Sequence, residues 1–221
     1  MLKIFKQHQL EQYANQLPSL FLKTGLQSNP PLSNLKISQI NLNDITYCHG
    51  NLVILKKYAP SVFEKYVTTV TYGGKEIRLN LYDTAGQDDY DRLRPLSYQD
   101  ANLVLVCYDV TNPTSFENVL IKWYPEVNHF CRDVPVILIG CKTDLRKDKE
   151  RTRRLKAMDQ APITYTQGEE TRRHMSAELY LECSAKYREN VEDVFRDATK
   201  KALASSRRAR HRTKKRHCVV L

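Results

Sequence analysis

The sequence predicts a doubly wound α/β fold built on a mostly parallel sheet, and three observations support this. Two apolar runs, residues 103–108 and 134–139, show no alternation, as in strands buried on both faces of a sheet. A helical stripe of apolar residues lies between these runs, and another lies near the end of the chain. Strands alternating with helices of this length form sheets covered on both sides.

A β-hairpin is expected upstream of the two apolar runs. Residues 67–72 are rich in β-branched side chains and residues 76–82 alternate strictly between apolar and polar. Gly73 and Gly74 lie near the centre of this segment, and a glycine pair suits the left-handed backbone of a tight hairpin turn.

The helices have their own local signals. Asn112-Pro113 is a typical helix start, and a stripe at helical spacing follows it. A short strand is expected over residues 179–181, before the last helix. The two stripes consist of Phe116, Val119, Leu120, Trp123, Val127 and Phe130, and of Val191, Val194, Phe195, Ala198 and Ala202.

Composition narrows the class of protein. The six cysteines form no C-x-x-C pair and no histidine cluster accompanies them, so we expect reduced thiols in the cytosol. No apolar run reaches the length of about 18 residues that spans a bilayer, and the first 25 residues do not have the pattern of a secretory signal. Seven of the basic residues lie between Arg207 and His217, where no acid occurs. Without them the net charge falls from +10 to +3 (28 basic minus 25 acidic residues), so the basicity belongs to the tail.

Polar motifs follow three of the expected strands. In such a sheet, ligands bind where the strands end. Asp83-Thr84-Ala85-Gly86-Gln87 follows the strand at 76–82. An Asp there can hold hydrated Mg²⁺, a glycine lets a backbone N–H approach a phosphate, and a Gln can orient water for in-line attack. Alone, the motif could also be an ordinary turn.

Two further loops suit a purine base. In Gly140-Cys141-Lys142-Thr143-Asp144, a carboxylate can accept two hydrogen bonds from guanine, while the lysine stem lies along the ring. In Glu182-Cys183-Ser184-Ala185-Lys186, backbone N–H groups can contact the base oxygen. A solvated Lys/Asp loop is the alternative explanation for the first of these. Three loops in this order and at these spacings are not expected by coincidence.

With these motifs, residues 58–221 resemble the Rho family of small GTPases in the Ras superfamily. Residues 58–66 are similar to the effector loop, switch I, and residues 83–98 are similar to switch II. The charged stretch at residues 146–173 lies where Rho proteins carry their insert helix. The resemblance implies the small-GTPase version of the α/β fold, which belongs to the P-loop NTPases.

The resemblance also implies ligands and roles. The ligands are GTP or GDP and Mg²⁺, with Ser61 holding the metal through its hydroxyl and Asp83 through water. Gly86 would contact the γ-phosphate and Gln87, the catalytic residue, would position the hydrolytic water. The base pocket would consist of Lys142, Asp144, Ser184, Ala185 and Lys186. Cys141 stands where many relatives have Asn or Thr, so one hydrogen bond that braces the loop is weaker here. The implied partners are Rho effectors, exchange factors, GTPase-activating proteins and the dissociation inhibitor.

The chain ends in Cys218-Val219-Val220-Leu221, a prenylation signal in which the final Leu favours geranylgeranyl on Cys218. A single lipid anchors weakly, and the basic stretch adds about 1 kcal/mol per Lys or Arg near an anionic membrane surface. We expect this tail to be disordered until it meets the cytoplasmic face of the plasma membrane. A nuclear-localisation or RNA-binding role is the alternative. No aromatic residue interleaves the basic ones, which favours the membrane, with no nucleic acid bound other than the guanine nucleotide.

One expected motif is missing from the sequence. P-loop proteins carry G-x-x-x-x-G-K-[S/T] after the first strand, where it cradles the phosphates. The corresponding region, about residues 35–42, lacks it, and the single Gly-Lys pair of the chain is Gly74-Lys75 in the hairpin turn. The first strand and first helix are therefore expected to be atypical or missing. If the strand is replaced, residues 51–55 are the best apolar run and residues 35–42 the other candidate.

Three regions follow from these patterns: an atypical segment of low order at 1–57, a Rho-type domain without its P-loop at 58–204, and the basic tail at 205–221. Two functions are open. The first is a membrane-anchored GTP-dependent switch in actin and filopodia signalling, with impaired nucleotide binding. The second is a non-enzymatic prenylated interaction module, a GTPase body whose first segment is truncated or alternatively spliced.

Overall fold

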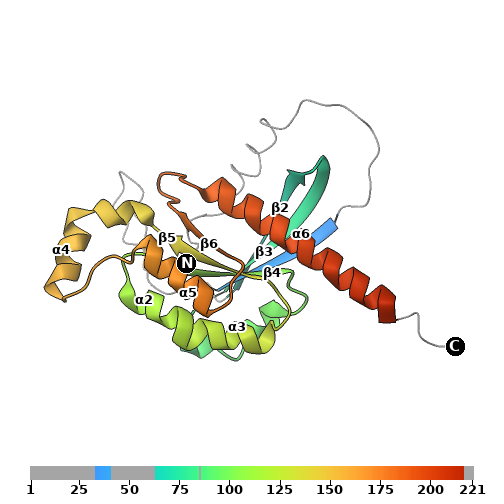
Figure 1. Ribbon diagram of the computed structural model, residues 1–221, viewed down its shortest axis with the longest axis horizontal. Coiled ribbons are helices and arrows are strands. Elements are labelled where there is room, and N and C mark those ends of the chain that lie inside the picture. Colours follow the sequence, from blue (N-terminus) through green and yellow to red (C-terminus); the bar gives the residue numbers. More distant parts are fainter. Residues whose placement is uncertain (1–32, 41–62, 85, 217–221) are drawn as a thin grey trace.

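A six-stranded sheet organises the computed structural model, which describes residues 33–40, 63–84 and 86–216 (Figure 1). The strand order is β2-β3-β1-β4-β5-β6; β2 runs antiparallel to β3, and all other neighbours are parallel. The predicted fold class is thereby confirmed. The strands are β1 (Ser33–Ile40), β2 (Phe63–Tyr72), β3 (Lys75–Thr84), β4 (Leu103–Asp109), β5 (Val136–Cys141) and β6 (Leu179–Cys183).

The centre of the sheet is filled by β1. It pairs with β3 on one side, for example Leu35 with Leu79, and with β4 on the other, for example Ile37 with Leu103. The first strand is thus present, and it comes from the second of the two candidate segments. The preferred candidate, residues 51–55, lies outside the described residues. Parallel pairing on both sides leaves no open edge between β3 and β4.

The hairpin forms as predicted. β2 and β3 pair along their whole lengths, from Phe63 with Thr84 to Tyr72 with Lys75. Gly73 and Gly74 have φ angles of 59° and 73°, the left-handed conformation that a two-residue turn between twisted strands requires.

Both faces of the sheet are covered, which explains the unbroken apolar sequence of β4. All seven of its residues are buried, and alternate side chains enter separate cores. Leu105 and Cys107 belong to the core under the C-terminal helix, whereas Val104 and Val106 belong to the core under the helices of the opposite face. β5 begins two residues later than its apolar run predicts, because Pro135 has no N–H to donate to a neighbouring strand.

Helices connect the strands and form the outer layers (Figure 1). Helix α2 begins as predicted: the Asn112 side chain accepts a hydrogen bond from the Ser115 N–H, and Pro113 follows. Pro125 interrupts the hydrogen-bond ladder of this connection, and a π-helical turn separates α2 from α3. The helices are α2 (Pro113–Asn118), η4 (Val119–Trp123), α3 (Tyr124–Phe130), α4 (Lys149–Ala157), α5 (Tyr165–His174) and α6 (Val191–Arg216).

The tail differs from its prediction. Helix α6 continues without interruption to Arg216, so the expected disorder is wrong for residues 205–216. No Gly or Pro occurs from residue 191 onward, and Ala, Leu, Lys and Arg are strong helix formers, so the packed first half of α6 can propagate into the basic segment. None of the described helices has the length and apolar character that crossing a membrane requires.

Candidate functional site

Three polar residues predicted from the sequence, together with Asp109, which was not predicted, gather where the parallel strands end. Asp83 lies near the end of β3, Asp109 closes β4, Lys142 follows β5 directly and Ser184 follows β6 directly. Because β1, β3, β4, β5 and β6 are mutually parallel, these four positions lie at one edge of the sheet.

Lys142 is fixed by a buried acid. Its backbone has a φ angle of 64°, and its Nζ lies 3.0 Å from Asp109 Oδ2. Burial lowers the pKa of Lys142, and the Asp109 carboxylate raises it part of the way back. The other oxygen of Asp109 accepts hydrogen bonds from the Thr111 N–H and hydroxyl, at 2.7 and 2.8 Å. The lysine side chain is thus held at the carboxyl end of the sheet.

Asp144 and Ser184 connect the loop that follows β5 with the loop that follows β6. The Ser184 hydroxyl donates to Asp144 Oδ1 at 2.6 Å, and Ser184 is fully buried. Ala185 packs at the margin of the core, and Lys186 is exposed with its Nζ above the Tyr187 ring. The structure therefore brings Asp144 and Ser184, 40 residues apart in the chain, into direct contact.

A second link between these loops is an ion pair that the sequence did not reveal. Arg146 donates to both oxygens of Glu182, at 2.5 and 2.6 Å, and its Nε donates to the Ile163 carbonyl at 2.9 Å. Glu182 also accepts from the buried Tyr180 hydroxyl, which contacts that of Tyr108 at 2.6 Å. Such a two-pronged Arg–carboxylate pair fixes geometry as well as charge, so it holds the two loops in register.

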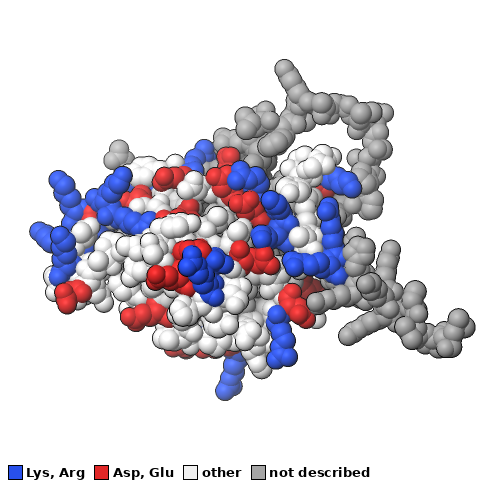
Figure 2. Space-filling model, viewed as in Figure 1, with Lys and Arg blue, Asp and Glu red and all other residues white. Residues whose placement is uncertain are grey.

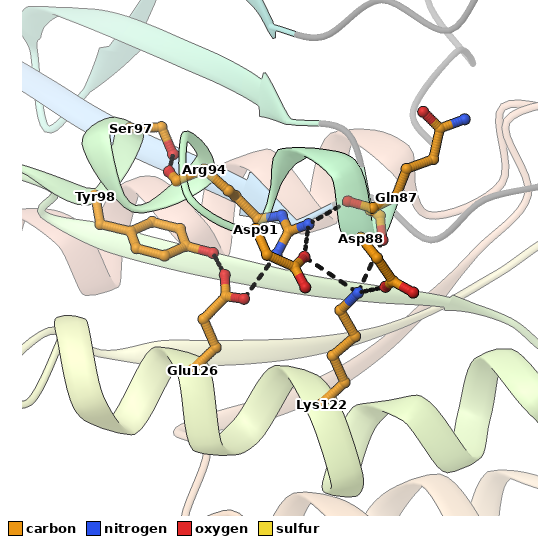
Figure 3. A network of polar contacts seen from close by, with 9 residues as sticks. Gln87, Asp88, Asp91, Arg94, Ser97, Tyr98, Lys122 and Glu126 are labelled. Carbon is orange, nitrogen blue, oxygen red and sulfur yellow. Dashed lines mark hydrogen bonds and ion pairs between the residues drawn. The ribbon is translucent and has the colours of Figure 1, made fainter.

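Switch II is held by a network centred on Arg94 (Figure 3). The Arg94 side chain is completely buried and lies between Asp91, at 2.6 Å, and Glu126 of α3, at 2.7 Å. It also donates to the Gln87 carbonyl at 3.0 Å and lies over the Trp123 ring, 4.8 Å from its centroid. One side chain thereby joins residues 87–94 of switch II to the α3 layer.

Lys122 provides a second attachment. Its Nζ donates to the Gly86 carbonyl at 3.3 Å and also contacts Asp88 and Asp91. Burial raises the pKa of Asp91, but the bonds from Arg94 and Lys122 outweigh it, and the pKa lies below its ordinary value. The side-chain amide of Gln87 points away from this network (Figure 3), so the backbone around Gln87 is fixed while its amide remains available.

Not every predicted residue can be placed. Ser61 and Cys218 lie outside the described residues, as do residues 41–62, which follow β1. Asp83 is buried near the end of β3 with 9% of its surface exposed, and Gly86, three residues further along the chain, is also buried. Asp109 was not predicted because the apolar run at residues 103–108 was taken to end one residue before it. Glu126, the partner of Arg94 on α3, lies 32 residues further along the chain, and nothing in the sequence pairs the two.

A parallel sheet whose carboxyl end carries Asp83 and two connected polar loops is consistent with the Ras-like class of α/β proteins. The family model described as "Ras family" matches residues 45–204. The chain belongs to this family and, within it, to the Rho proteins, as the sequence predicted. Ras-family GTPases bind GTP or GDP together with Mg²⁺.

Three relatives show how closely the chain follows that group. Mouse "Rho-related GTP-binding protein RhoF" is 63% identical over 177 residues, covering 80% of this chain and 83% of the relative. The human protein of the same name is 66% identical over 164 residues, covering 74% and 78%. Human "Rho-related GTP-binding protein RhoD" is 51% identical over 166 residues, covering 75% and 79%.

Proposed function

We propose that this chain is a membrane-anchored Rho-type GTP-binding protein that recognises guanine but binds the nucleotide weakly. The contact of Asp144 with Ser184, beside Lys142 held on Asp109, carries the proposal. These groups preorganise a carboxylate and an aliphatic stem for a guanine ring. The part of the site that would hold the phosphates lacks the usual binding loop, because no G-x-x-x-x-G-K-[S/T] motif follows β1.

The roles that we propose for the remaining site residues are those that membership of the Rho family suggests. Ser61 and Asp83 would hold Mg²⁺, Gly86 would contact the γ-phosphate and Gln87 would orient the attacking water. The base pocket is Lys142, Asp144, Ser184, Ala185 and Lys186. Effectors, exchange factors, GTPase-activating proteins and a dissociation inhibitor are the partners that the Rho membership suggests. RhoF-like signalling to actin and filopodia at the cytoplasmic face of the plasma membrane is the cellular role that we infer.

A second function is supported by the network around Arg94. Arg94 and Lys122 hold switch II through contacts with the Gln87 carbonyl, the Gly86 carbonyl and Glu126. A surface fixed in this way can bind regulators without a γ-phosphate to order it. The chain would then act as a prenylated interaction module without enzymatic activity.

Guanine recognition is tested by thermal unfolding of the chain with about 1 mM GDP or ADP and Mg²⁺. A ligand that binds the folded state stabilises it by RT ln(1 + [L]/Kd), so even weak binding raises Tm. We expect GDP to raise Tm more than ADP, and Asp144→Ala to abolish the difference by removing the carboxylate that reads the base. Equal shifts for the two nucleotides would contradict the proposed pocket.

Membrane attachment is tested with Cys218→Ser. Loss of the prenylated cysteine leaves the basic segment as the only membrane signal, and one signal gives weak, reversible binding. We expect the variant expressed in animal cells to move from the membrane fraction to the soluble fraction, with its remaining membrane pool removed by high salt. Ser205→Cys, a substitution outside the prenylation motif, is the control for effects of expression and fractionation. A Cys218→Ser protein that stays on membranes in high salt would argue against the lipid anchor.

A further inference from the structure

A pocket of about 260 Å³ lies between the β2–β3 turn and the second half of α6, far from the base-reading loops in the chain. It combines an apolar floor with polar and cationic groups from both elements. The lining residues are Tyr72, Gly73, Lys75, Ile77, Leu203, Ser206 and Arg207.

The periodicity of both elements explains why two cations meet here. Ile77 is buried under α6, and strand alternation places Lys75, two residues earlier, on the same face of β3. Leu203 packs against the same core, and Arg207 lies one helical turn further along α6 on the same side. Lys75 and Arg207 are therefore the first residues beyond the core on their respective elements, and both face the pocket.

The two cations are not neutralised by the described part of the protein. Neither Lys75 nor Arg207 makes an ion pair with a described residue, whereas neighbouring cations on α6 do: Lys201 and Arg208 both pair with Glu178. Figure 2 shows Lys and Arg side chains gathered where α6 passes the hairpin. The pocket thus presents two uncompensated charges and the Ser206 hydroxyl over an apolar floor.

We propose that this pocket binds the phosphomonoester of an anionic lipid head group, of the phosphoinositide class. A phosphomonoester carries a charge of about −1.5 to −2 at neutral pH and three acceptor oxygens, which suits two cations and a hydroxyl donor. The floor of Ile77, Leu203 and Tyr72 suits the uncharged ring carbons of the head group. The inference rests on the proposed membrane attachment and adds a specific lipid contact to it.

The direction of α6 favours a lipid over a soluble phosphate. The helix runs from Arg207 to Arg216, a length of about 14 Å at 1.5 Å per residue, and Cys218 follows two residues later. The pocket is therefore within reach of the bilayer surface on which the anchor would sit. Binding there would lay the C-terminal half of α6 and the hairpin turn against the membrane and fix the orientation of the domain.

The test measures binding of the full-length, unprenylated chain to two kinds of phosphatidylcholine vesicle with equal total charge. One contains phosphatidylinositol 4,5-bisphosphate and the other contains phosphatidylserine. The pocket variant is Lys75→Ala with Arg207→Ala. The matched control is Lys149→Ala with Arg153→Ala, which removes the same charge from exposed positions on α4, at the other end of the molecule (Figure 1).

We expect the pocket variant to lose about tenfold or more in affinity for the phosphoinositide vesicles and much less for phosphatidylserine, whereas the control changes both little. Equal losses for both variants on both vesicles would overturn the pocket and leave only general charge attraction. If the pocket variant binds both vesicles as tightly as the wild-type chain does, the proposed pocket is wrong and the basic membrane signal stands. Failure of the wild-type chain to bind either vesicle would overturn the basic membrane signal and the pocket together. Competition by soluble inositol 1,4,5-trisphosphate against the phosphoinositide vesicles is the result expected of a head-group site.

Discussion

Exchanging residues 1–57 for the N-terminal segment of a Rho protein that carries G-x-x-x-x-G-K-[S/T] is expected to increase GDP affinity at least about a thousandfold. The phosphate loop contributes several charge-assisted hydrogen bonds, each worth about 1.5 to 3 kcal/mol. Three of them amount to more than 4 kcal/mol, which is about three powers of ten in Kd. The groups that we propose to read the base, Asp144 with Ser184 and Lys142 with Asp109, are the same in both proteins.

The measurement is equilibrium binding of a fluorescent GDP analogue, with and without Mg²⁺. A third protein carries the same exchange with the lysine of the grafted motif replaced by alanine. This control separates the phosphate contacts from any general repair of the fold, because β1 already fills the centre of the sheet in the original chain. Tight binding by the original chain would show that its residues after β1 form a phosphate site of another kind, and the proposed impairment would be wrong.

Arg94→Ala is expected to destabilise the protein by about 3 to 5 kcal/mol, the usual cost of leaving a buried ion pair with one partner. The Arg94 side chain is fully buried and Glu126 is 13% exposed, so little water can compensate. Asp91 is 44% exposed and contributes less. Urea unfolding gives the free energy, and hydrogen exchange of residues 86–98 reports whether switch II loosens as the Gln87 carbonyl loses its donor.

Two further variants make the Arg94 result interpretable. Arg94→Lys keeps the charge but cannot reach Asp91, Glu126 and the Gln87 carbonyl together, so an intermediate loss is expected. Arg154→Ala removes an exposed arginine paired with Glu150 on α4 and should cost less than about 0.5 kcal/mol. An Arg94→Ala loss no larger than that of Arg154→Ala would mean that the network does not hold switch II.

The predicted elements were most accurate where one local signal is sufficient. A glycine pair between β-branched and alternating runs specifies the β2–β3 turn, and both glycines take positive φ angles. Asn112-Pro113 specifies the start of α2. The two loops that we propose to read the base lie together because each follows an apolar strand, and in a parallel sheet the chain positions after the strands converge at one edge.

Other features of the fold could not be predicted from a single local signal. β1 was the second choice because Asn34, Lys36 and Ser38 interrupt its apolar pattern, unlike β4, which is apolar throughout. Its place depends on pairing with both β3 and β4, a property of three strands and not of one. The helical state of residues 205–216 was missed because charge density was taken as a sign of disorder, whereas the packed part of α6 provides the nucleus from which the helix extends.

By itself, the sequence determined the α/β class, the Rho family and the absence of a G-x-x-x-x-G-K-[S/T] motif after the first strand, because each of these depends on residues close together in the chain. It also supplied the residues that we propose to read the base. Only the tertiary structure decided that residues 33–40 supply the central strand, that Arg94 ties switch II to α3, and that Lys75 and Arg207 share one pocket. These features join segments far apart in the chain. Their partners are selected by the packing of the two cores, which no local pattern encodes.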